Sequence, residues 1–313
     1  MNLDPTTVAL TRCSSYAQPE LDETLARVLS AIRWPGLRSA NVLLKPNLIS
    51  AKHSRLACTE GAFITAAARW LLAQGAKVSI GDSPAFGTAA IVLQALGIAD
   101  ELAALGVEIR NFRKGRRVKL PDSSGWAVLA EAALDCDLLV SLPRVKAHAQ
   151  TRLTLAVKNC FGCVVGLRKS WWHMLYGGHE NDFSDRLAQL PGILPPILSL
   201  VDGIAAMHIT GPLRGEPYPL ALVGASMNPV AMDTALHAVL GVAPEQSLLM
   251  AASRRAGLTG ATIEELAFPL SAPEELLARD FLLPDALNPI RFSLFRYLKS
   301  TVCRLRLQRQ DLK

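Results

Sequence analysis

The chain has 313 residues and a mass of 33.7 kDa, with 50% hydrophobic residues, 19% charged residues and a mean hydropathy of +0.24. This composition excludes intrinsic disorder for most of the chain. The net charge of +6 arises at one end, because residues 291–313 contain seven of the 33 basic residues and one of the 27 acidic residues. The remaining body is neutral, so the charge does not predict a nucleic-acid-binding protein.

The cysteine content and the apolar runs bear on the cellular compartment. Six cysteines in a chain of this length are too few for a disulfide framework, which predicts a reducing environment. Residues 1–5 lack the basic stretch and apolar run of a secretory signal. The most hydrophobic region, 193–209, is interrupted by Pro195, Pro196 and Asp202, so no membrane span is predicted. We therefore expect a soluble cytoplasmic protein.

The first third of the chain alternates short β-rich runs with segments of helical periodicity. In chain order, the pattern predicts a strand at Val8–Thr11, a helix at Glu20–Ile32, a strand at Val42–Leu44, a helix at Glu60–Gln74, a strand at Lys77–Ile80 and a helix at Thr88–Leu96. This alternation predicts an α/β fold, with a mostly parallel sheet and helices on both faces.

The rest of the body continues with fewer and more widely spaced elements. We expect a solvated basic loop at Arg110–Lys119, strands at Leu138–Leu142, Leu198–Val201 and Leu220–Val223, and helices at Gln150–Gly166, Pro229–Leu240 and Gln246–Ala256. The body, residues 1–290, is either one unit or two lobes, 1–150 and 190–290, joined by a site-forming segment at 142–180. Residues 291–313 form a basic amphipathic helical extension, which packs on the body or binds an anionic membrane surface or a protein partner.

Polar side chains directly follow each of the predicted core strands. The clusters are Lys45-Pro-Asn47, Gly81-Asp-Ser-Pro84, Pro143-Arg-Val-Lys-Ala-His148, Asp202-Gly203 and Gly224-Ala-Ser226. Ordinary turns use Pro, Gly, Asn, Asp and Ser at such positions, so any single cluster has a simple explanation. Turns do not require long cations, however, and ligands bind beyond the carboxyl ends of parallel strands. Lys45, Lys146 and His148 therefore indicate a binding site at this edge.

The segment from Leu138 to His179 contains no Asp or Glu but six Lys or Arg residues and three His residues. Such a segment requires an anion, which is either a phosphate or carboxylate ligand or acidic side chains from elsewhere, such as Asp82 and Asp202. If Thr151, Thr154 and Lys158 lie on one helix, their spacing places them on a single face that could hold the same anion.

Two cysteines in this region, Cys160 and Cys163, form one C-x-x-C motif. A structural zinc site requires a second such pair, and no cluster-binding C-x-x-C-x-x-C run occurs in the sequence. Small buried residues on a helix are the simpler explanation, and a redox or metal role is the alternative. The motifs of P-loop, dinucleotide-binding, α/β-hydrolase and zinc-protease proteins are also absent from the sequence.

The polar clusters also resemble the motifs of a known family, the domain of unknown function 362 proteins. The matching residues are Lys45-Pro-Asn-Leu48, Gly81-Asp-Ser-Pro84, Leu142-Pro-Arg-Val-Lys-Ala-His148, Thr151, Lys158-Asn159, Phe161-Gly-Cys163, Gly166-Leu-Arg-Lys169, Val201-Asp-Gly203, Gly211-Pro-Leu-Arg-Gly215 and Ala231-Met-Asp233. The resemblance implies an α/β fold and a prokaryotic cytoplasmic protein without a settled reaction. Many relatives carry an iron–sulfur module, whose motif this sequence lacks, and Cys160 departs from the family pattern.

Three hypotheses follow for the function. The first is an enzyme that acts on an anionic small molecule, in which Lys146, His148, Asp82 and Asp202 carry out catalysis, the two aspartates as general bases or as ligands of a divalent metal. The expected substrate-binding residues are Lys45, Asn47, Ser83, Thr151, Thr154, Lys158, Asn159 and Lys169. The second is a redox or metal-handling protein that uses Cys160 and Cys163 with an electron-transfer partner. The third is a non-catalytic binding protein held at a membrane by its tail.

Overall fold

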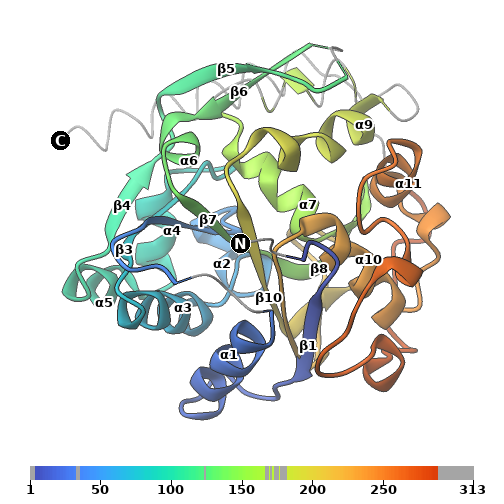
Figure 1. Cartoon of the computed structure of the whole chain (residues 1–313), viewed down its shortest axis with the longest axis horizontal. Helices are drawn as coiled ribbons and strands as arrows, with labels where there is room; N and C mark the ends of the chain where they lie inside the picture. Colours follow the sequence, from blue (N-terminus) through green and yellow to red (C-terminus); the bar gives the residue numbers. More distant parts are fainter. Residues whose placement is uncertain are drawn as a thin grey trace.

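The computed structural model describes residues 4–287, apart from 33–35, 123–124, 166–168, 170, 173–175 and 177–181. The predicted tail at 291–313 therefore lies outside the described residues. A 10-stranded sheet runs through the molecule, and its main path has the order β1-β12-β10-β7-β2-β3-β4 (Figure 1). These strands are β1 (Val8–Arg12), β2 (Asn41–Pro46), β3 (Lys77–Asp82), β4 (Glu108–Asn111), β7 (Leu138–Leu142), β10 (Ile197–His208) and β12 (Leu222–Ser226).

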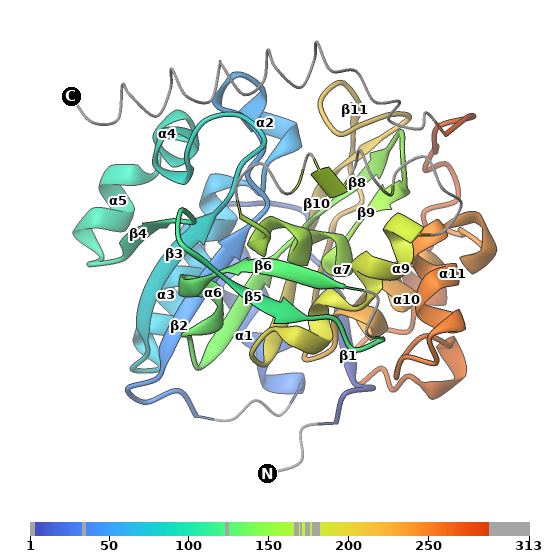
Figure 2. The same ribbon diagram turned by 90° about the horizontal axis from the view of Figure 1, so that it is seen from above.

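Three short strands extend the sheet beside β10, and two more form a separate hairpin. The short strands are β8 (Arg144–His148), β9 (Arg152–Thr154) and β11 (Glu216–Tyr218) (Figure 2). The hairpin consists of β5 (Gly115–Lys119) and β6 (Trp126–Ala130). The prediction of a loop at Arg110–Lys119 is wrong, because half of this stretch pairs in β5 and its first two residues end β4.

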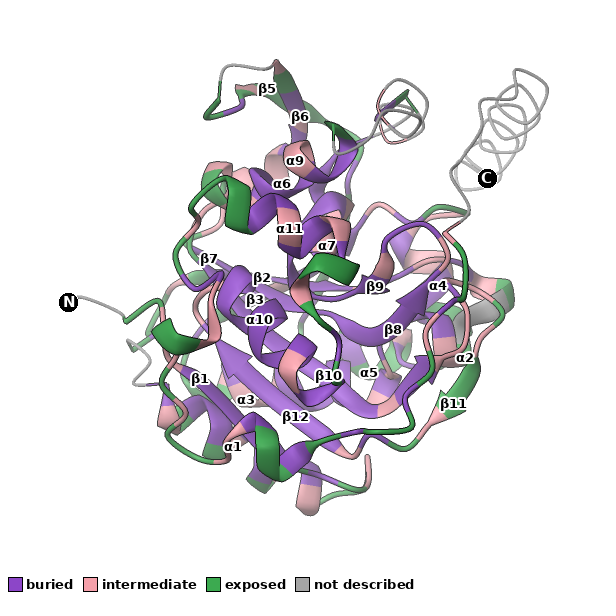
Figure 3. Ribbon diagram, turned by 90° about the vertical axis from the view of Figure 1, so that its right-hand side faces the viewer, coloured by how far each residue is buried: buried purple, intermediate pink, exposed green. Residues whose placement is uncertain are grey.

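Helices cover both faces of the sheet (Figure 3). They are α1 (Glu20–Ala31), α2 (Ser54–Ala57), α3 (Gly61–Ala73), α4 (Ala89–Ala95), α5 (Ala99–Ala104), α6 (Glu131–Leu134), α7 (Ala156–Asn159), α9 (Asp182–Ala188), α10 (Pro229–Val239) and α11 (Leu248–Arg255). The fold is therefore α/β, as predicted. Among the described residues, none of these helices has the length and apolarity needed to cross a bilayer.

Side chains of the central strands alternate between two apolar layers, as the period of a strand requires. On β2, Val42 and Leu44 pack in the layer that contains α1 and α3, whereas Leu43 packs in the opposite layer. On β7, Val140 packs in the layer that contains α1 and α3, and Leu139 packs in the opposite layer. Burial on both faces explains why these strands are continuous hydrophobic runs in the sequence.

The directions of the strands decide which of their ends meet. β4, β3, β2, β7 and β10 are parallel to one another, but β12 is antiparallel to β10. The carboxyl end of β12, with Gly224–Ser226, therefore lies at the opposite edge of the sheet. The prediction that this cluster joins the others is wrong, because a sequence pattern does not report strand direction.

Asp202 lies within β10, not at its end, because this strand continues for 12 residues to His208. Its side chain is fully buried. Its Oδ1 atom accepts a hydrogen bond from the Tyr16 hydroxyl at 2.7 Å, and its Oδ2 atom accepts one from the backbone N–H of Glu60 at 3.0 Å. Glu60 is the N-cap residue of α3, so Asp202 ties the start of this helix to the sheet.

Arg144 provides the positive charge beside Asp202. Its Nη1 atom lies 3.6 Å from Asp202 Oδ2, and the arginine side chain is itself 1% exposed. The guanidinium also donates hydrogen bonds to the carbonyls of Ala205 and Cys58, both at 2.9 Å. Because both partners are buried and each has further hydrogen bonds, this ion pair joins β8, β10 and α3 in one polar network.

We predict that Asp202→Ala lowers the free energy of unfolding by about 3–5 kcal/mol, because the Arg144 guanidinium then loses its buried counter-charge and keeps only the partly exposed Glu60 carboxylate, 3.4 Å away. Urea denaturation measures this change. The control is Glu245→Ala, which removes the half-exposed pair with Arg254 and is expected to cost less than about 1 kcal/mol. Equal effects of the two substitutions would contradict the structural role of Asp202.

Candidate functional site

A pocket of about 440 Å³ lies at the carboxyl ends of β2 and β3, between β8 and the segment that begins with α7. Its polar lining comes from Lys45, Asn47, Asp82, Ser83, Lys146, His148, Gln150, Thr154, Lys158, Asn159 and Lys169. All of these except Gln150 are site residues predicted from the sequence. The carboxyl edge of the sheet thus brings together side chains that are more than 120 positions apart in the chain.

Lys45 and Asp82 form a buried ion pair at the floor of the pocket, with 2.9 Å between Nζ and Oδ1. The carboxylate also accepts hydrogen bonds from the backbone N–H of Leu48 at 2.9 Å and of Ser83 at 2.8 Å. Both oxygens are therefore occupied, and the charge of Lys45 is balanced. Asp82 serves first as the counter-ion of Lys45.

Asn159 connects the end of α7 to the two central strands. Its amide nitrogen donates to the Ser141 hydroxyl at 2.9 Å and to the Lys45 carbonyl at 3.2 Å. Its oxygen accepts from Lys45 Nζ at 3.1 Å and from the Asn47 side chain at 3.3 Å. Asn159 therefore fixes the position of Lys45 and of α7, which carries Lys158.

Lys146 is fully buried, and its Nζ atom donates to the Ala57 carbonyl at 2.7 Å and to the Asn47 side-chain oxygen. Burial lowers the pKa of this amine to about 7, and the positive charges of Lys158 and Arg144 act in the same direction. Among the described residues, Lys146 has no carboxylate within ion-pair distance. Its protonation near neutral pH therefore depends on what else occupies the pocket.

Lys158 and His148 are in direct contact, with 3.2 Å between Nζ and Nε2. Burial lowers the pKa of the Lys158 amine to about 8. The other ring nitrogen of His148, Nδ1, accepts hydrogen bonds from the backbone N–H groups of Gln150 at 3.1 Å and of Thr151 at 3.4 Å. The chain turn that follows β8 therefore holds the imidazole in place.

Two buried polar atoms in the lining have no hydrogen-bond partner among the described residues. They are Oε1 of Gln150 and Oγ1 of Thr154, whose side chains are 8% and 4% exposed. Unpaired buried polar atoms are costly, so a pocket that presents them is suited to a ligand that hydrogen-bonds to them. At the other side of the pocket, Lys169 donates to the Ser83 carbonyl.

Thr151, Thr154 and Lys158 do not share one helix, so the prediction of a common helical face is wrong. Thr151 lies in a turn, Thr154 ends β9 and Lys158 lies in α7. The Thr151 hydroxyl donates to the Leu153 carbonyl at 2.9 Å and is not part of the pocket lining. Thr154 and Lys158 both reach the pocket, but they do so from separate elements.

Asp202 is likewise not part of the pocket lining, because it is held in the network with Arg144. Its predicted catalytic or metal-binding role has no support in this geometry. Asp82 and Asp202 occupy separate networks, so they do not form a pair of metal ligands. In the part of the chain that the structure describes, no three His, Cys, Asp or Glu side chains gather as ligands of a metal ion.

Cys160 and Cys163 lie in a short 3-10 helix, η2 (Cys160–Cys163), and both are buried free thiols. Burial raises the pKa of Cys163 to about 12 and raises that of Cys160 well above its usual value. Reactive and metal-binding cysteines are thiolates, whereas these two are thiols at neutral pH. The geometry therefore favours a packing role.

Asp233 supports the site, although the sequence indicates it only as part of the motif Ala231-Met-Asp233 and without a role. It lies inside α10 and is buried, and its Oδ1 atom accepts a hydrogen bond from the Ala156 N–H at 2.7 Å. It thereby holds the start of α7, the element that carries Lys158. Burial raises the pKa of Asp233 to about 8. In the sequence, an acidic residue within a mostly apolar predicted helix is the feature that could have indicated this role.

Gly162 lies in the motif Phe161-Gly-Cys163, and the fold gives this position a strict spatial requirement. An added Cβ atom would overlap Cε and Nζ of Lys45 and Oδ1 of Asp82. Only glycine lets the backbone approach this ion pair so closely. The sequence offers a glycine at this position, but the close approach is visible only in the fold.

We predict that Gly162→Ala destabilises the protein by about 1–3 kcal/mol, because the methyl group displaces the Lys45–Asp82 pair. The control is Gly192→Ala, where the new Cβ has its nearest neighbour, Pro121, at 4.0 Å. Chemical denaturation of both variants measures the difference. A Gly162 variant as stable as the Gly192 variant would show that the pair tolerates displacement.

Comparisons with known proteins place the chain in a family. Residues 42–238 match the family model described as domain of unknown function (DUF362). The chain is 39% identical over 298 residues to the thylakoid-associated protein sll1697 of Synechocystis sp., and the match covers 94% of this chain and 92% of that protein.

Two solved structures show a more distant likeness. The lactate racemase apoprotein from Thermoanaerobacterium thermosaccharolyticum has a TM-score of 0.41 at 15% identity, over 62% of this chain and 50% of its own. A Thermotoga maritima protein has a TM-score of 0.40 at 12% identity, over 63% of this chain and 53% of its own. The chain thus matches about half the length of these structures. From its family model and its 39% identical relative, the chain belongs to the DUF362 family.

Proposed function

We propose that this protein is an enzyme that acts on an anionic small molecule, bearing a carboxylate or a phosphate, bound in the pocket at the carboxyl edge of the sheet. The observation that carries the proposal is an imbalance of charge. Lys146 and Lys158 line the pocket without a carboxylate within ion-pair distance among the described residues, while Asp82, the acidic group in the described lining, is already paired with Lys45. The pocket therefore has cations available for a ligand.

The cost of burial supports this proposal. Burying an ammonium group without a counter-charge is unfavourable, which is why the pKa values of Lys146 and Lys158 fall to about 7 and about 8. A bound anion would provide the missing charge beside Lys146 and favour its protonated form. Gln150 and Thr154 would supply further hydrogen bonds to it.

A binding role alone would not require the contact between His148 and Lys158. An amine and an imidazole 3.2 Å apart in a pocket are groups that can transfer protons near neutral pH. This contact favours an enzyme over a non-catalytic binding protein. The redox alternative has less support, because Cys160 and Cys163 are buried thiols that do not line the pocket.

We predict that sulfate raises the melting temperature, and that this effect is larger at about pH 6 than at about pH 9. Sulfate keeps its charge over this range, whereas Lys146 and Lys158 lose theirs as the pH rises through about 7 and about 8. Because the protonated amines attract the anion, the affinity falls with rising pH. Sodium chloride at equal ionic strength controls for general salt effects.

The matched variants are Lys146→Met in the pocket and Lys119→Met on the exposed face of β5. The first is expected to weaken sulfate binding about tenfold, equivalent to about 1.4 kcal/mol, and the second to leave it unchanged. If the Lys146 variant and the wild-type protein respond equally to sulfate, the pocket is not the anion site.

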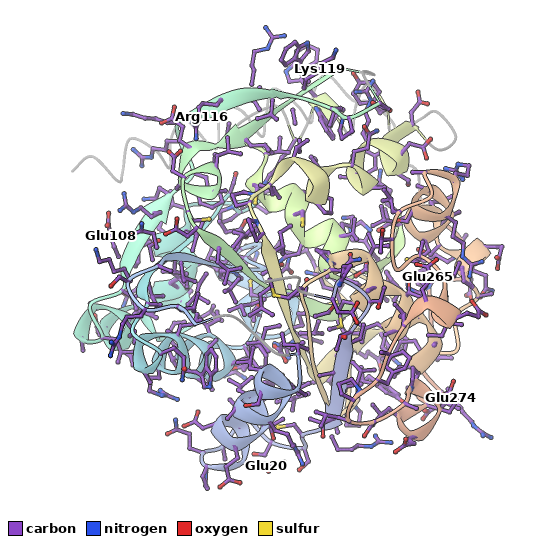
Figure 4. All side chains as sticks on the ribbon, viewed as in Figure 1. Glu20, Glu108, Arg116, Lys119, Glu265 and Glu274 are labelled. Carbon is purple, nitrogen blue, oxygen red and sulfur yellow. The ribbon has the colours of Figure 1, made fainter. Side chains whose placement is uncertain are left out.

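A second candidate function, association with an anionic membrane surface, has its own observations. The 39% identical relative is named a thylakoid-associated protein. In this chain, the β5–β6 hairpin lies along one side of the molecule and exposes cations, among them Arg116 and Lys119 (Figure 4). Trp126 in β6 is 50% exposed, and its ring packs against the Arg117 guanidinium. Basic residues beside an exposed indole suit a membrane interface.

We predict that the full-length protein floats with vesicles that contain phosphatidylglycerol but not with pure phosphatidylcholine vesicles. The variant Lys114→Glu/Arg117→Glu/Lys119→Glu is expected to lose this binding, because reversed charges repel the lipid headgroups. Reversal of Lys77, an exposed residue at the start of β3, serves as the control. Unchanged flotation of the hairpin variant would rule out this surface.

A further inference from the structure

The protonation of the pair formed by His148 and Lys158 can be assigned from the hydrogen bonds around the imidazole. Nδ1 of His148 accepts from two backbone N–H groups, those of Gln150 and Thr151. A nitrogen that accepts hydrogen bonds carries no proton, so the neutral ring has its proton on Nε2. The Nε2–H group then points at Lys158 Nζ, 3.2 Å away.

This assignment determines the state of Lys158. An ammonium group has only donors, and two donors facing each other at this distance repel. A neutral amine has one lone pair, which accepts the proton of the imidazole N–H. The geometry therefore favours the free amine of Lys158, and burial acts in the same direction by lowering its pKa to about 8.

We propose that Lys158 is a nucleophilic catalytic residue that forms an imine with the carbonyl group of an anionic substrate, such as a 2-oxo acid or a phosphorylated aldehyde. This inference rests on the proposed function, because it requires the anion site in the pocket. A neutral, half-buried lysine amine is the form of the residue that attacks carbonyl carbons. Lys146, which has no carboxylate within ion-pair distance among the described residues, binds the anionic group of the same substrate.

The reaction balances without any further reagent. The Lys158 nitrogen forms a bond to the carbonyl carbon, and the carbonyl oxygen leaves as water with the two hydrogens of the amine. As the substrate enters, its carbonyl oxygen can replace the amine as the acceptor of the His148 N–H group. His148 thereby stabilises the negative charge that develops on this oxygen during attack.

Other charged groups surround Lys158 in the pocket, and their protonation also affects the pH dependence of its reactivity. They are Lys45 from β2, Asp82 from β3, Lys146 and His148 from β8, and Lys169. Lys45 and Asp82 neutralise each other, and burial is the cause that lowers the pKa of Lys158.

The experiment traps the imine in the full-length protein. Glyoxylate, a small anionic aldehyde, is added together with cyanoborohydride, and peptide mass spectrometry measures the modification of each lysine with time. Near pH 7 we expect Lys158 to be modified at least about tenfold faster than the exposed Lys119, because more of it is the free amine. Glycolate, which has an alcohol in place of the aldehyde, is expected to slow the modification of Lys158 alone.

The outcomes separate this inference from the proposed function. If sulfate and glycolate raise the melting temperature but Lys158 reacts no faster than Lys119, the imine is excluded while the anion site stands. If neither anion binds and Lys158 is not modified, both proposals fall. Preferential modification of Lys158 that glycolate suppresses supports both.

A variant tests the part played by His148. His148→Leu removes the N–H donor and leaves a side chain of similar volume, so the ammonium of Lys158 is no longer repelled. The midpoint of the pH profile for modification of Lys158 is expected to move to higher pH, while that of Lys119 stays fixed. An unchanged midpoint for Lys158 would show that His148 does not control its protonation. The wild-type measurement stands alone if this variant does not fold.

Discussion

A lysine amine that is buried at the edge of a sheet either forms an ion pair with a carboxylate or loses its proton more easily. The properties of the candidate site follow from this constraint. Lys45 meets Asp82, and the pair forms a neutral floor. Lys146 is buried and Lys158 is half-buried, both without such a partner among the described residues, so their pKa values fall toward neutrality. Burial of these amines costs free energy while they are charged. For the same reason, a bound anion changes their protonation, and they can exchange protons near neutral pH.

The fold contains two buried ionic networks, one built on arginine and one on lysine, and they have different roles. Arg144 and Asp202 join β8, β10 and the start of α3, and arginine keeps its charge under all ordinary conditions, which suits a permanent structural role. The lysine ammonium has a lower pKa than the guanidinium in water, about 10.4, and desolvation lowers this pKa readily. The chain thus places arginine where charge is needed for architecture and lysine where protonation can vary.

Much of the fold was predictable from the sequence. The elements in the first hundred residues, from Val8 to Leu96, appear close to their predicted bounds, because their hydrophobic periods and caps are local properties. The elements predicted wrongly depend on distant partners. β9 replaces part of a predicted helix because Arg152–Thr154 pairs with β8, and β10 extends past Val201 because β8 and β11 pair with its second half.

The sequence by itself determined the α/β class, the family and the gathering of cations at the carboxyl ends of the strands, because patterns of hydrophobicity and residue type are written in it. Only the tertiary structure decided which cation meets which acid, since pairing depends on distances between elements. It placed Asp82 beside Lys45, kept Asp202 away from the pocket and set the His148 ring against Lys158. Burial, which shifts the amine pKa values, is likewise a property of the packed molecule and not of the chain.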